Sequence, residues 1–135
     1  MSLFKNNYVE IDTSTEPLVL ITYSSAEPTL AEFDAYLREI EIIYERVPYC
    51  AFVLDSTRVK YLRSELRIKQ GTWMKENEKL IGVKQKGAAF VVNGVMVQML
   101  LQGIMLVNPF PAPYKVFAKY EEALQWATNQ LKMQK

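Results

Sequence analysis

Hydrophobic and polar positions follow two different periods along the chain, and the period switches repeatedly. Residues 8–12 (YVEID) alternate like a half-buried strand, and residues 18–23 (LVLITY) are rich in residues that favour strands. The polar TSTE segment between them predicts a hairpin. In residues 29–47, apolar positions three and four apart predict an amphipathic helix, and Thr29 and Glu32 have the spacing of a capping box.

The switching continues to the end of the chain. Residues 50–55 are a continuous apolar run, as in a strand covered on both faces, and residues 64–81 predict a second helix. Gly71 lies inside this helix and indicates either a close approach or a break between two short helices. The other expected elements are a strand at 87–92, a helix at 93–107 with Asn93 as candidate cap, a strand at 114–120 and a closing helix at 120–132.

The order β-β-α-β-α-β-α-β-α predicts an α/β fold with a mixed, mostly parallel five-stranded sheet. Strands that alternate with helices are joined by right-handed crossovers, and the opening hairpin adds an antiparallel edge. The chain has 135 residues, half of them hydrophobic. We therefore expect one domain, residues 1–135, that buries its own core.

Charge and cysteine content change this picture little. The net charge is +1 and gives no overall attraction to nucleic acid, although residues 58–86 hold nine bases against three acids. Solvated helix faces explain that segment better than an anionic partner. The start MSLFKNNY lacks the pattern of a signal peptide, so a cytoplasmic protein is expected. The single cysteine, Cys50, lies in an apolar run and is expected to be buried.

The residue types present limit the chemistry. The chain contains no histidine, which excludes Ser-His-Asp and Cys-His catalysis and ordinary zinc sites. Its five glycines are scattered and form no phosphate-binding loop. Asp55 ends a predicted strand, where α/β folds bind ligands, but beside Ser56 and Thr57 it fits a loop organiser better. We expect no enzyme, cofactor or metal.

The predicted helix at 93–107 has an unusual composition. Between Val95 and Val107 only Gln98 and Gln102 are clearly polar. A helix that is apolar nearly all round needs cover on nearly all sides, and this one is too short to span a bilayer. Either it is buried within the domain, or its surplus apolar surface meets a partner subunit, an apolar molecule or a membrane. The candidate surface comprises Met96, Met99, Leu100, Ile104, Met105 and, from an exposed position in the following NPFPAP loop, Phe110.

Two stretches carry a resemblance to a known family. In the first, Asp55 ends a predicted strand, Val59 and Tyr61 lie in the loop that follows, and Ser64 comes just before a helix. These positions match the STAS pattern, in which an aspartate follows the third strand, a loop with a valine and an aromatic residue comes next, and Asp-Ser-Ser-Gly opens a helix. The second stretch, residues 114–127 (YKVFAKYEEALQWA), resembles the final strand and helix of uncharacterised SpoIIAA-like proteins. The chain thus resembles the SpoIIAA-like group of the STAS superfamily, whose best-known members are bacterial anti-sigma-factor antagonists.

The resemblance implies a SpoIIAA-like fold and places Ser64 at the phosphorylatable serine. Around it, Arg63, Glu65 and Leu66 depart from the pattern. A serine ahead of a helix is also a natural N-cap, and we favour the cap over the phosphoacceptor. The candidate switch or partner loop consists of Asp55, Ser56, Thr57, Arg63 and Ser64.

Three functions remain as alternatives. The first is a non-enzymatic domain that acts by protein association, as a homo-oligomer through the helix at 93–107 and the NPFPAP loop. The second is a carrier or sensor of a small apolar, lipid-like ligand, by analogy with the related fold of CRAL-TRIO domains. The third is an antagonist switched by phosphorylation at Ser64. No nucleic-acid partner and no transmembrane segment are expected.

Overall fold

The computed structural model of the chain describes residues 3–60, 62–107 and 109–133, without the side chains of Leu100, Ile104 and Val107. Within these ranges it contains six strands and five helices. In chain order they are β1 (Leu3–Lys5), β2 (Val9–Asp12), β3 (Leu18–Tyr23), α1 (Leu30–Arg46), β4 (Cys50–Asp55), α2 (Ser64–Glu76), α3 (Glu78–Lys84), β5 (Gln85–Val91), α4 (Val95–Val107), β6 (Tyr114–Phe117) and α5 (Tyr120–Lys132).

The strands form one sheet whose spatial order is the chain order, from β1 at one edge to β6 at the other. The pairs β1–β2 and β2–β3 are antiparallel, and β3 to β6 run parallel. The predicted α/β class and the mostly parallel sheet are therefore confirmed. The predicted strand number of five is wrong, because β1 extends the hairpin with Phe4 opposite Ile11. Three residues are too few to show a period in the sequence.

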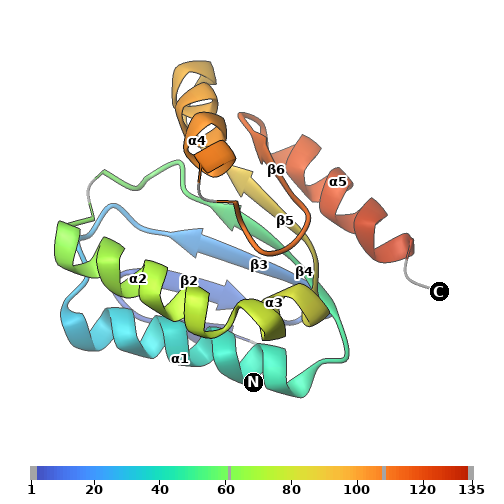
Figure 1. Cartoon of the computed structure of the whole chain (residues 1–135), viewed down its shortest axis with the longest axis horizontal. Coiled ribbons are helices and arrows are strands. Elements are labelled where there is room, and N and C mark those ends of the chain that lie inside the picture. The colour runs from blue at the N-terminus through green and yellow to red at the C-terminus, as the bar shows by residue number, and fades with distance from the viewer. Residues whose placement is uncertain (1–2, 61, 108, 134–135) are drawn as a thin grey trace.

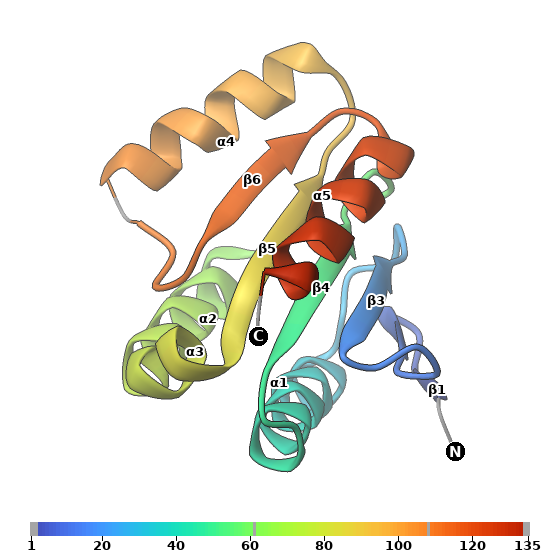
Figure 2. The same ribbon diagram turned by 90° about the vertical axis from the view of Figure 1, so that its right-hand side faces the viewer.

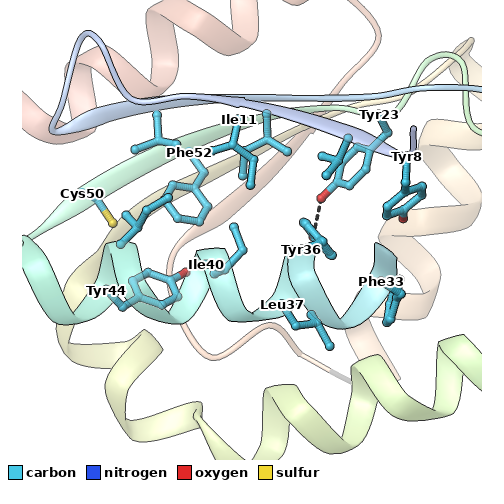
Figure 3. Close-up of a cluster of buried hydrophobic side chains, with 14 of the residues drawn as sticks. Tyr8, Ile11, Tyr23, Phe33, Tyr36, Leu37, Ile40, Tyr44, Cys50 and Phe52 are labelled. Carbon is cyan, nitrogen blue, oxygen red and sulfur yellow. Dashed lines mark hydrogen bonds between the residues drawn. The ribbon is translucent and has the colours of Figure 1, made fainter. Parts of the chain in front are cut away.

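Helices cover the two faces of the sheet unequally. The first three helices pack on one face and α5 packs on the other (Figures 1 and 2). Helix α1 begins with the predicted capping box: Thr29 Oγ1 accepts a hydrogen bond from the Glu32 N–H at 3.1 Å, and Glu32 Oε1 accepts one from the Thr29 N–H at 2.9 Å. Cys50 is fully buried in the core beneath this helix (Figure 3).

Four buried tyrosines distinguish this core. The rings of Tyr8, Tyr23 and Tyr36 lie 5.4 to 5.6 Å apart, and the hydroxyls of Tyr23 and Tyr36 share a hydrogen bond of 2.5 Å (Figure 3). Burial raises the pKa of Tyr36 to about 12 and also raises the pKa values of Tyr8, Tyr23 and Tyr44. All four side chains are therefore neutral at physiological pH.

The second predicted helix is divided, but not at the predicted residue. Gly71 lies inside α2, and the break falls at Asn77, where φ is −109° and ψ is 13°. The Asn77 side-chain amide donates to the carbonyl oxygen of Trp73 at 2.9 Å. Asparagine side chains compete in this way with backbone hydrogen bonding, which explains why the helix stops here and not at the glycine.

Candidate functional site

Helix α4 lies beside the edge strand β6 and packs on neither face of the sheet as the other helices do (Figures 1 and 2). Gln98 Nε2 donates to the carbonyl oxygen of Val116 at 2.8 Å, which ties the helix to this strand. The chain enters the helix through Gly94, whose φ of 92° lies in the left-handed region that favours glycine. Because α4 lies at the edge of the sheet, much of its surface is not covered by the rest of the domain.

The uncovered side of α4 is apolar. The exposed fractions are 85% for Met96, 83% for Leu106 and 65% for Met99. Of the other residues predicted for this surface, Met105 is half buried, and the side chains of Leu100 and Ile104 lie outside the described residues. The apolar surplus seen in the sequence is therefore present at the protein surface, where such patches mark contact sites.

Phe110 lies in the loop between α4 and β6, and its expected exposure is wrong. The ring is half buried and makes edge-on contacts with Phe90, at a centroid distance of 5.6 Å, and with Tyr114, at 6.4 Å. A ring attached to a proline-stiffened loop beside two aromatic side chains gains more by stacking on them than by facing water. Phe110 thus fixes this loop to the sheet.

A cleft of about 530 Å³ separates α4 from the carboxyl ends of β4 and β5. Open α/β sheets bind ligands at this end of their strands, and the volume lies in the range of small-molecule sites. The cleft is lined by Ser56, Thr57, Val59, Phe90, Val92, Asn93, Val97 and Leu101. Sequence reasoning named Ser56 and Thr57 but missed the apolar wall, because the wall forms only when α4 stands off from β5.

The loop after β4 is organised by Asp55, as the sequence predicted. Asp55 Oδ1 accepts hydrogen bonds from the Thr57 N–H at 3.1 Å and from the Thr57 hydroxyl at 2.7 Å. The Ser56 N–H donates to the carbonyl oxygen of Val91 at 2.9 Å, which fixes the loop against β5. Asp55 therefore shapes one side of the cleft.

The predicted cap at Ser64 is wrong. Ser64 is the first residue of α2, Arg63 occupies the N-cap position, and the Arg63 side chain makes no capping hydrogen bond. The Ser64 hydroxyl is exposed and accepts a hydrogen bond from Arg67 Nη2 at 3.0 Å. Arg63 instead binds Glu27 at 3.1 Å and Glu65 at 3.2 Å.

These contacts divide the predicted switch loop into two parts. Ser56 and Thr57 line the cleft, and Asp55 holds their loop through its bonds to Thr57. Arg63 instead donates a hydrogen bond to the Pro28 carbonyl oxygen, just before α1. Tyr61 lies outside the described residues.

Among the residues that the structure describes, no group of three or more His, Cys, Asp or Glu side chains could hold a metal ion. Across the same described ranges, no helix is both long enough and apolar enough to cross a membrane.

Comparisons with known proteins identify the architecture. No protein-family model matches the chain, and no curated protein matches it. A solved structure that it resembles is an uncharacterized protein of the DUF3478 family from Shewanella loihica PV-4, described as having a SpoIIAA-like fold. The identity is 16%, the TM-score is 0.66, and the match covers 92% of this chain and 98% of the other. The chain therefore has the SpoIIAA-like fold, as its STAS-like stretches predicted.

Proposed function

We propose that this SpoIIAA-like domain is not an enzyme and acts by binding another protein through one side of α4. We call this side the outer face, and it consists of Val95, Met96, Met99, Gln102, Gly103 and Leu106. The observation that carries the proposal is that these residues are exposed on a helix without a single charged side chain.

Physical chemistry favours a protein as the occupant. Covering a methionine or leucine side chain gains roughly 1.5–3 kcal/mol, so a face with several of them is better covered than solvated. Methionine is flexible and polarisable, and it adapts to partner surfaces of irregular shape. A helix that presents an apolar face at regular spacing fits a groove or a second helix.

Site-specific cross-linking in cells of the natural host tests this proposal. A photoreactive benzoylphenylalanine at Met96 should form covalent adducts with protein, because that side chain is 85% exposed on the outer face. The matched control carries the same group at Lys79, an exposed position on α3. Equal adducts at both positions, or none at Met96, would contradict the proposal.

A second candidate function is supported by the cleft. Phe90 and Val92 form the wall of the cleft on the side of the sheet. Val97 and Leu101 of α4 form the opposite wall, and Ser56 and Asn93 add hydrogen-bonding groups. Apolar walls with a few polar groups are typical of small-molecule sites. The candidate is a carrier or sensor of a small, mainly apolar molecule.

Native mass spectrometry of protein purified gently from its host tests the ligand. Extra non-covalent mass should be present in the unmodified protein and absent from Val97→Trp, because the indole would fill part of the cleft. Val97 is 47% exposed, so the larger side chain should not disturb folding. Val83→Trp, at a 64% exposed position on α3, is the matched control and should keep the ligand. Unmodified protein of bare mass would contradict this candidate.

A further inference from the structure

We infer that the partner of the outer face is a second copy of this chain, with two α4 helices packed side by side about a two-fold axis. The inference rests on the proposed function and names its partner. Four observations support it: the spacing of the outer-face residues, the place of Gly103, the absence of charge and the area available.

The spacing is that of a helix pair. Val95, Met99, Gln102 and Leu106 are separated by four, three and four residues, the repeat that keeps one stripe of a helix facing a partner helix. All four are exposed. Helix α4 runs along the outer edge of the sheet beside β6 (Figure 2), and its exposed stripe is open to a second helix.

Gly103 lies next to the stripe. A glycine in the interior of a helix is unfavourable relative to alanine. Among the residues and side chains that the structure describes, a Cβ added at Gly103 would meet nothing within 4 Å, so none of these requires a glycine there. Glycine permits close approach of two backbones, and a partner helix on the stripe would pass at this point.

The absence of charge suits a self-complementary contact. A two-fold interface sets the same residues of both copies against each other, so a charged residue near the axis would repel its own copy. The outer face carries no acidic or basic side chain. Gln102 has both a donor and an acceptor in its amide and can therefore bond to Gln102 of a second copy.

The exposed area reaches that of a stable dimer when the outer face is fully covered. With exposed fractions of 63% for Val95 and 83 to 85% for Leu106 and Met96, the outer face presents roughly 600 Å² per copy, so complete coverage of two copies would bury about 1,200 Å², the lower limit of stable interfaces. Interfaces between identical subunits are also more apolar than other protein contacts.

Sedimentation equilibrium of Gly103→Ala tests the inference. The added methyl group should raise the dimer dissociation constant about tenfold, because it overpacks the closest contact of the two helices. Gly71→Ala is the matched control: it is also an exposed glycine inside a helix with nothing within 4 Å of an added Cβ. Both variants should melt at the same or a higher temperature than the unmodified protein. A weaker dimer in Gly103→Ala would then not result from a less stable fold.

Two results would overturn the inference. One is an unmodified protein that stays monomeric at millimolar concentration, and the other is a dimer that Gly103→Ala and Gly71→Ala affect equally. After either result, the proposed function would still hold if Met96 cross-links specifically to a different protein. If Met96 forms no protein adduct at all, the proposed function and this inference both fail.

Discussion

Raising the pH from 10 to 12 should unfold this protein. Tyr8, Tyr23, Tyr36 and Tyr44 are buried and have raised pKa values. Well below pH 10 these groups are protonated in both the folded and the unfolded state, so their ionisation does not lower the free energy of unfolding. Above pH 10 the unfolded chain releases their protons while the folded chain keeps them, so stability falls. With its pKa raised to about 12, Tyr36 alone accounts for a loss of about 2 kcal/mol across this window.

Phenolate absorbance and far-ultraviolet circular dichroism, recorded together against pH, check this expectation. The phenolate signal of the four buried tyrosines should change together with the circular dichroism, because these side chains ionise only when the core opens. The chain has eight tyrosines in all, so this step accounts for only part of the phenolate absorbance. Tyr44→Phe removes one of the four groups, so the slope of unfolding free energy against pH should decrease by about 1.4 kcal/mol per pH unit. That slope is independent of any stability lost through the Gln85–Tyr44 hydrogen bond. Ionisation of all eight tyrosines with intact circular dichroism would contradict the prediction.

The sequence predicted the elements whose period or capping residues are unambiguous. Residues 18–23 and 50–55 became β3 and β4 with the predicted bounds, and the closing helix at 120–132 became α5. In each of these segments the local pattern agrees with the packing in the sheet. The prediction failed where local signals compete, as at Gly71 and Asn77, since helix propensity alone does not say which residue finds a better hydrogen bond.

The candidate site could be predicted only in part. The composition of residues 95–107 showed that the helix has more apolar surface than one sheet can cover. It did not show which side stays exposed, because that depends on the position of α4 beside β6. The cleft was missed for the same reason, since its walls also depend on how α4 lies relative to β5 and to the loop after β4.

Met99→Lys should abolish pairing of two copies at working concentrations. In the inferred dimer this substitution brings two ammonium groups into a contact that excludes water. Uncompensated charges in such contacts cost a few kcal/mol, and about 3 kcal/mol corresponds to a roughly hundredfold higher dissociation constant. Met99 is 65% exposed in the single chain, so the variant should fold with unchanged stability.

Met133→Lys is the control that isolates the surface. Met133 is 68% exposed at the end of α5, so the same chemical change is made at nearly the same exposure, away from α4. If both variants weaken pairing equally, the effect comes from net charge and the outer face is not the interface. Met99 does not line the cleft, so a bound apolar molecule should remain in Met99→Lys. Loss of that molecule together with pairing would mean that cleft and outer face act as one surface, and that the two candidate functions are one.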